Sequence, residues 1–187
     1  MLPQMIRSMS RFATRLAAAA AVVVLAACGP SSPASGTPTA EAVSAASVTP
    51  SPSLAPSEPF AVSQVTLRGP GGEALEVPVY VAAAPQERAR GLMEREDLPD
   101  GTGMLFVFPA DHRGAFYMYR TPLPLSIAFA DSQGRIVALL DMEPCTSPDA
   151  DACERYDPGV SYRSALEVEQ GFLDAHGVST DWRLDAP

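Results

Sequence analysis

The run GMLFVF, residues 103–108, places five large apolar side chains in succession after a glycine. An apolar run of this length, bounded by turn residues, is typical of a strand that is covered on both faces. The preceding Leu98-Pro99-Asp100-Gly101 supplies such a turn. We therefore expect residues 104–108 to form a strand in the middle of the core.

A hairpin is predicted on the N-terminal side of this run. Residues 75–81 alternate Leu and Val with Glu, Pro and Tyr, which is the period of a strand with one buried face. Residues 65–68 alternate in the same way, and the Gly-Pro-Gly-Gly sequence of residues 69–72 provides the turn. Because Pro78 has no backbone N–H, we expect the second strand to lie at an edge or to contain a bulge.

Downstream, the pattern predicts two short helices and several short strands. Pro85 suits the first position of a helix over residues 85–90, and Gly91 ends it. A second helical turn is expected over residues 172–176. Further strands are expected at residues 115–119, 126–130, 135–142, 162–168 and 182–184. Short strands at this frequency indicate a mainly β domain, a sandwich or a barrel, rather than alternating β and α units.

Residues 1–27 have the parts of an export signal. Three arginines precede an apolar stretch over residues 16–27, which is shorter than the ~20 residues needed to span a bilayer. Leu25-Ala26-Ala27-Cys28 is similar to a bacterial lipobox, whose cysteine becomes the lipidated N-terminus. An ordinary secretory signal followed by a chance cysteine is the alternative. We expect an exported protein that is lipid-anchored to a bacterial membrane, on its periplasmic or outer face.

The segment after Cys28 predicts a tether. Residues 28–60 are rich in Pro, Ser, Ala and Thr, and their only charged residues are Glu41 and Glu58. Such a composition cannot bury enough apolar surface to fold, so we expect a disordered linker. The remaining residues, 61–187, have the length of one β domain.

The charge of the chain argues against nucleic acid as a partner. The net charge is −9, and removal of the three signal arginines gives −9 − 3 = −12 for the mature protein. The sequence contains no lysine. Binding to a phosphate backbone needs a positive surface, which this composition does not supply.

Cys145 and Cys153 lie in a polar loop of a chain that we expect to be exported. An oxidising compartment favours their pairing as a disulfide. Closing so short a loop would stabilise the fold by about 2.5 kcal/mol in the chain-entropy model. A reactive thiol or half of a metal site is the alternative, although no histidine is near them in the sequence.

Several motifs resemble one family of prokaryotic proteins. They are `PQERARGLMEREDLPDGTGMLFVFP` (85–109), `FYMYRTPLPLSIAFADSQGRIV` (116–137), `EPC` (143–145) and `YRSALEVEQGFLDAHGV` (162–178). Together they resemble the family catalogued as domain of unknown function 192 (DUF 192), from about Leu75 to Leu184. The resemblance implies an antiparallel β-sandwich of jelly-roll type with one or two short helices, often exported or lipid-anchored, and no established reaction. The two-cysteine loop is also similar to that of exported members, which favours the disulfide.

Tyr119, Arg120 and Ser126 depart from the family pattern. Its central motif, Phe-Trp-Met followed by Lys or Arg, Asn and Thr, falls on residues 116–121, and Tyr119 and Arg120 differ from it. Ser126 stands where members commonly carry Asp before the Ile-x-Phe strand. If that carboxylate belongs to a shared site, the site is altered in this chain.

The sequence offers no recognisable catalytic set, and we expect neither a metal site nor a cofactor. His112 and His176 are the only histidines, and neither lies in a nucleophile motif. The methionines of the domain could suit copper(I), but each occurs among apolar residues and is better explained by core packing.

Arginine and aromatic side chains are the better candidates for a binding site. On a strand from Phe116 to Arg120, alternation would place Phe116, Met118 and Arg120 on one side and the two tyrosines on the other. A helix with two arginines could converge on this strand. The predicted ligand-binding residues are Arg88, Arg90, Tyr117, Met118 and Arg120. The alternative is that these arginines form structural ion pairs.

These observations predict a lipid-anchored envelope protein whose β domain binds a small ligand or an envelope protein without catalysis. An enzyme that acts on cell-wall or carbohydrate substrates would need two carboxylates facing a cleft, for which Asp141 and Glu143 are candidates. An envelope assembly factor would need a broad apolar patch, which Tyr117, Tyr119 and Leu123 could supply if exposed.

Overall fold

The computed structural model describes residues 60–186. The predicted signal peptide, the lipidation site Cys28 and all but the last residue of the predicted tether lie outside this range. Among the residues described, no helix is both long and apolar enough to cross a membrane.

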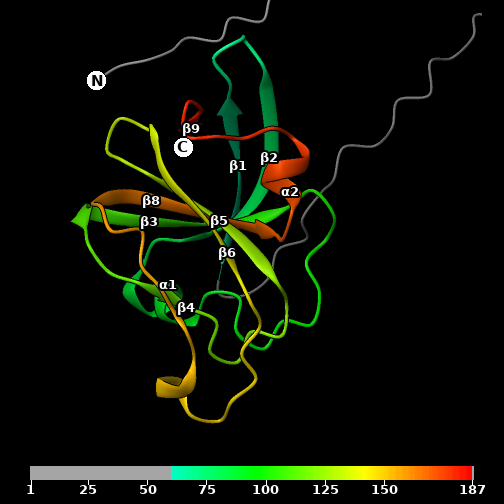
Figure 1. The fold of residues 1–187 in the computed structure, drawn as a ribbon, viewed down its shortest axis with the longest axis vertical. Helices are drawn as coiled ribbons and strands as arrows, with labels where there is room; N and C mark the ends of the chain where they lie inside the picture. Colours follow the sequence, from blue (N-terminus) through cyan, green and yellow to red (C-terminus); the bar gives the residue numbers. More distant parts are fainter. Residues whose placement is uncertain (1–59, 187) are drawn as a thin grey trace, which may run out of the picture. The chain divides into compact units, whose positions relative to one another are not determined.

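One seven-stranded sheet organises the described residues (Figure 1). Its strands are β1 (Ala61–Arg68), β2 (Ala74–Ala82), β3 (Gly103–His112), β5 (Leu125–Ala130), β6 (Ile136–Met142), β8 (Tyr162–Glu169) and β9 (Arg183–Asp185). Their order in space is β6-β5-β8-β3-β2-β1-β9. The predicted hairpin is β1–β2, and the predicted central strand is β3, the fourth of the seven.

The sheet is mixed because β2 and β3 run parallel. A crossover that contains α1 (Pro85–Arg90) joins the end of β2 to the start of β3. Strands that pair in parallel need such a connection. The position of Pro78 was predicted wrongly, since β2 lies between β1 and β3 and not at an edge. Pro78 is tolerated there because pairing with β3 begins only at Val79, so the ladder needs no N–H from the proline.

The two ends of the strand order meet. The N–H of Ile136 donates to the carbonyl of Trp182 at 3.1 Å, and that of Leu184 to the carbonyl of Gly134 at 2.7 Å. Gly134 has φ +76°, and a Cβ there would lie 2.6 Å from the Leu184 oxygen, so only glycine fits this junction. The mainly β class with two short helices is confirmed. Seven strands form a mixed sheet whose two ends meet, and β4 and β7 form a separate two-stranded sheet.

Two hydrophobic clusters cover the opposite faces of the sheet. Successive residues of β3 point to opposite faces, and accordingly Met104 and Phe106 belong to one cluster and Leu105 to the other. All three are buried, so the prediction of a strand covered on both faces is confirmed. We call the cluster with Met104 the α1-side cluster and the cluster with Leu105 the Trp182 cluster.

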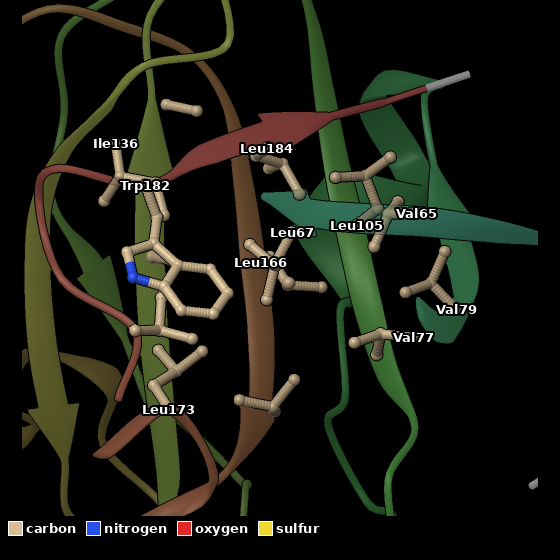
Figure 2. Close-up of a cluster of buried hydrophobic side chains, with 14 residues drawn as sticks. Val65, Leu67, Val77, Val79, Leu105, Ile136, Leu166, Leu173, Trp182 and Leu184 are labelled. Carbon is tan, nitrogen blue, oxygen red and sulfur yellow. The ribbon is translucent and has the colours of Figure 1, made fainter. Parts of the chain in front are cut away.

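The Trp182 cluster fills the inside of the curled sheet. Figure 2 shows the indole ring of Trp182 among Ile136, Leu166 and Leu173. Leu173 comes from α2 (Phe172–Ala175), which closes one end of this cluster. Burial of these large side chains is the main favourable contribution to folding on this face.

The segment before β5 differs from its prediction. Of the strand expected over residues 115–119, only β4 (Phe116–Tyr117) forms, and it pairs with β7 (Arg155–Tyr156), which was not predicted. A turn follows, in which Arg120 has φ +53°. The expected alternation of Phe116, Met118 and Arg120 on one side is therefore wrong for Arg120, because the backbone turns before reaching it.

The predicted disulfide between Cys145 and Cys153 is present, with an S–S distance of 2.03 Å. It closes a loop that contains a short 3-10 helix, η1 (Ala150–Ala152). The N–H of Cys145 also donates to the carbonyl of Thr121 at 3.2 Å. The loop is thereby attached to the turn that follows β4.

Candidate functional site

A cavity of about 220 Å³ lies between α1, β4 and the sheet. Figure 1 shows α1 and β4 next to each other, on the side of the sheet that carries the α1-side cluster. We call this cavity of about 220 Å³ the α1 cavity. Its lining consists of Arg88, Ala89, Arg90, Gly91, Leu92, Met93, Phe106, Phe108, His112, Ala115, Phe116, Tyr117, Met118, Thr121, Leu125, Tyr162 and Glu167.

Local sequence fixes α1 above the cavity. Glu87 reaches back to accept hydrogen bonds from the N–H groups of Ala84 at 2.7 Å and Ala83 at 2.9 Å. These two bonds lower the pKa of Glu87 below its usual value. Gly91, at φ +50°, ends the helix, and a Cβ there would lie 3.2 Å from the Phe106 ring. The glycine thus lets the helix end close to the cavity wall.

The two arginines of α1 have different surroundings. The guanidinium of Arg88 donates to the carbonyls of Ala83 and of Val107, the latter at 3.0 Å, and lies 5.0 Å from the centre of the Phe108 ring. Arg88 therefore braces the wall of the cavity. Arg90 is exposed and forms no ion pair with any residue between 60 and 186. Its guanidinium is available to a ligand.

Aromatic rings form much of the remaining wall. The Phe116 ring meets Phe106 edge-on at 5.0 Å, and Tyr162 lies 5.3 Å from Phe108 in the same arrangement. The hydroxyl of Tyr162 donates to the carbonyl of Gly114 at 2.9 Å. Burial raises the pKa of Tyr162 to about 12, so this hydroxyl remains protonated at neutral pH. The wall is apolar, rigid and uncharged on this side.

Glu167 lies in the middle of the sheet and lines the cavity. It pairs with Met104 on β3 and with Ile127 on β5, and it is only 5% exposed. No residue between 60 and 186 donates a hydrogen bond to its carboxylate. No buried side-chain N or O in that range is fully enclosed without a partner, so the Glu167 oxygens must keep access to the cavity. Burial raises the pKa of this carboxyl to about 8.

Sequence reasoning missed Glu167. A signal was present, since Glu167 stands between Leu166 and Val168 in a segment predicted to be a strand. An acidic residue inside such an apolar segment is unusual unless it has a partner or a function. The sequence does not show which strands lie beside this segment, and therefore does not show that Glu167 is buried.

The predicted site residues fall into two groups. Arg88, Arg90, Tyr117 and Met118 all line the α1 cavity. Arg120 does not line it; its guanidinium pairs with Glu94 at 3.1 Å on the surface. The structural ion-pair alternative thus describes Arg120, although an exposed pair of this kind contributes little stability.

Ser126, the departure from the family pattern, lies elsewhere. Its hydroxyl donates to Asp141 at 2.5 Å and accepts from the N–H of Gly171 at 3.0 Å. Ser126 is not among the residues that line the α1 cavity.

Within residues 60–186, no group of three or more His, Cys, Asp or Glu side chains is arranged to hold a metal ion.

Comparisons with known proteins place the chain among uncharacterised relatives. The model of DUF192, described as "Uncharacterized ACR", matches residues 66–186. A search of curated proteins gives no match. A Sinorhizobium meliloti 1021 structure, provisionally named a transcription regulator, is similar at 28% identity and a TM-score of 0.62, covering 67% of this chain and 94% of that one.

A structure from Novosphingobium aromaticivorans DSM 12444, of a protein of unknown function, is similar in fold. The identity is 22% and the TM-score 0.62, and the match covers 74% of this chain and 94% of that chain.

Proposed function

The chain belongs to the DUF192 family, and from this premise we propose that its β domain binds a small ligand in the α1 cavity without catalysing a reaction on it. The proposal also places the protein in the cell envelope, anchored to a membrane through Cys28. Each part has its own support and its own test.

Glu167 is the observation that carries the ligand-binding proposal. A buried carboxyl without a hydrogen-bond partner reduces stability by several kcal/mol compared with an apolar residue of similar size. Here the carboxyl is 5% exposed and opens into a cavity that is also lined by Arg90, which has no ion pair within residues 60–186. A ligand that hydrogen-bonds to Glu167 would remove this penalty and accounts for an acid at this position.

The lining of the cavity favours binding over hydrolysis of carbohydrate. That reaction uses two carboxyl groups, which are about 5–10 Å apart across the substrate. Glu167 is the one carboxylate among the described residues that line the α1 cavity. Neither Asp141 nor Glu143 lines the α1 cavity.

A role in assembly or in DNA binding has less support. Val62 and Val160 are the only exposed large apolar residues within the described range, and they lie in separate parts of the chain. The similar Sinorhizobium protein is named as a regulator, but residues 60–187 here carry a net charge of −9 − (3 − 2) = −10, because residues 1–59 contain three Arg and two Glu. Such a surface repels a phosphate backbone.

Substitution of Ala115 by phenylalanine tests ligand binding. Ala115 is exposed and lines only the α1 cavity, so the added ring should fill the cavity without disturbing the core. We expect full-length wild-type protein, purified from its own cells in detergent, to release a bound small molecule on denaturation. The variant should release less than about a tenth as much by mass spectrometry, in line with the loss of more than 1.4 kcal/mol of binding free energy.

Ala110→Phe is the matched control, since Ala110 is also exposed but does not line the cavity. It should release as much ligand as the wild type. Equal release from the Ala115 and Ala110 variants, or no release from any of the three proteins, would argue against a ligand in this cavity.

Membrane anchoring is supported by the order of features before the domain. A basic segment, an apolar stretch shorter than a membrane span, a lipobox-like sequence and a Pro-rich linker follow one another up to residue 60. Several acyl chains on one cysteine would hold the protein at a membrane much more firmly than one, at ~0.8 kcal/mol per buried methylene.

Cells that express the full chain and are fed an alkyne fatty acid should incorporate the label into this protein. Cys28→Ala should abolish labelling, whereas replacement of both Cys145 and Cys153 by alanine should not. A label that persists in the Cys28 variant would exclude this cysteine as the anchor.

A further inference from the structure

We propose that the α1 cavity binds a small zwitterion of amino-acid size, whose ammonium group pairs with Glu167 and whose carboxylate contacts Arg90. This inference rests on the proposed ligand-binding function and adds the chemical class of the ligand.

The volume limits the ligand to a small molecule. The cavity measures about 220 Å³, and an apolar cavity of about 150 Å³ accommodates benzene. By proportion, the α1 cavity holds roughly ten non-hydrogen atoms. This suits a single amino acid or amine.

Glu167 requires a group of opposite charge or a hydrogen-bond donor. Its neighbours across the sheet, Met104 and Ile127, are apolar and buried, and no residue between 60 and 186 donates a hydrogen bond to its carboxylate. The rings of Phe106 and Phe116 line the same cavity, and the faces of aromatic rings attract cations. A carboxylate together with aromatic rings is a suitable receptor for an ammonium group, with Glu167 accepting its hydrogen bonds.

The arginines argue against a purely cationic ligand. Arg88 and Arg90 line the same cavity and would repel a second positive charge. Arg88 already donates to two backbone carbonyls, while Arg90 has no ion pair within residues 60–186. A carboxylate on the ligand would give Arg90 a bidentate partner and would offset the repulsion. An ammonium and a carboxylate on one small molecule therefore match the charges of Glu167 and Arg90.

Binding of an ammonium group should be accompanied by proton release, so the direction of proton transfer on binding distinguishes the ligand classes. Burial raises the pKa of Glu167 to about 8, so the free protein carries a proton on this carboxyl at pH 7. An ammonium group stabilises the charged form and displaces the proton. An anionic ligand would instead retain the proton or take one up. The titratable and charged groups around the cavity are Arg88, Arg90, His112, Tyr117, Tyr162 and Glu167.

Titration calorimetry of the full chain in detergent, at pH 7 in two buffers of different ionisation enthalpy, measures both affinity and proton release. The probes are L-phenylalanine, 2-phenylethylamine, 3-phenylpropionate and 2-phenylethanol. We expect L-phenylalanine to bind most tightly, with release of nearly one proton. Glu167→Gln should weaken its binding at least about tenfold and abolish proton release, because the charge pair is lost.

Arg90→Ala should weaken L-phenylalanine at least about tenfold but leave 2-phenylethylamine unaffected or tighter, because only the carboxylate contact is removed. Arg68→Ala is the matched control, since Arg68 pairs with Asp185 at 2.6 Å on the surface, does not line the cavity and should change neither affinity. Melting curves of each variant would verify that it is folded.

Two results would overturn the inference and leave the proposed function standing. In one, 3-phenylpropionate binds most tightly without proton release and survives Glu167→Gln, which would identify an anion site. In the other, no probe binds although mass spectrometry still finds a ligand that Ala115→Phe removes, which would identify a different ligand class. If no probe binds and no ligand is carried, the proposed function fails as well.

Discussion

Glu167→Gln should stabilise the ligand-free protein increasingly as the pH rises. The difference in unfolding free energy between the variant and the wild type should grow by about 4 kcal/mol between pH 4.5 and pH 8, at about 1.4 kcal/mol for each unit of pKa shift. Glutamine has nearly the same shape as glutamate but carries no titrating proton. The variant therefore removes the pH-dependent part of the burial penalty and little else.

The direction in which the free energy of unfolding changes with pH depends on which state, folded or unfolded, holds the proton. In the folded domain the pKa of Glu167 is raised from its ordinary value of 4.5 to about 8. Between these two values the folded protein keeps a proton that the unfolded chain has released. The free energy of unfolding therefore falls as the pH rises through this window, and the loss is nearly complete above pH 8. Below pH 4.5 both states are protonated, and the residue makes no pH-dependent contribution.

Urea unfolding followed by circular dichroism at half-unit pH intervals measures this effect, after any bound ligand is removed by unfolding and refolding. Glu169→Gln is the matched control, because Glu169 lies two residues further along β8 and is exposed. Its curve should remain parallel to that of the wild type. Parallel curves for Glu167→Gln as well would show that the Glu167 carboxyl is ionised in the folded protein at neutral pH.

Trp182→Ala should reduce the free energy of unfolding by about 3–5 kcal/mol, the range for truncation of a large buried aromatic residue. Trp182 is 7% exposed, and its indole lies in the cluster on the inside of the curled sheet (Figure 2). The backbone carbonyl of Trp182 accepts the hydrogen bond from the N–H of Ile136, at the place where the two ends of the strand order meet. Loss of the ring leaves a void at this junction, where few neighbouring side chains can move to fill it.

Val62→Ala in β1 serves as the comparison, because Val62 is 41% exposed and should change stability by no more than about 0.5 kcal/mol. Trp182 is the only tryptophan of the chain, so circular dichroism must replace fluorescence in the variant. A loss below about 1 kcal/mol for Trp182→Ala would mean that the indole ring contributes little to the packing inside the sheet.

Periodicity predicted most of the elements because it depends only on neighbours in the chain. The alternation over residues 75–81 and the apolar run 104–108 correspond to β2 and β3, and Pro85 and Gly91 mark the limits of α1. Where the prediction failed, a distant contact decides the backbone. β4 is short because the chain turns after Met118 and pairs with β7, some forty residues away in the sequence.

The candidate site could likewise be predicted only in part from the sequence. The guanidinium and aromatic residues around α1 were recognised as candidates, because such side chains form hydrogen bonds and stack on ligands in any fold. Arg120 does not line the α1 cavity, because the backbone turns at this residue, where φ is +53°, and its guanidinium pairs with Glu94. Glu167 was missed because an acid in a strand becomes exceptional only when the strands on both sides and the helix above it are known.

The sequence by itself indicated most of the strands, the short helix with its two arginines and a disulfide between Cys145 and Cys153, because these depend on local pattern and on the order of residues along the chain. Only the tertiary structure decided that the sheet curls until β9 meets β6 and that Glu167 lies buried beneath α1. The physical reason is that the polarity around a side chain is set by strands and helices that are distant in the sequence. A carboxyl that water would solvate in one register becomes a buried group that needs a partner in another.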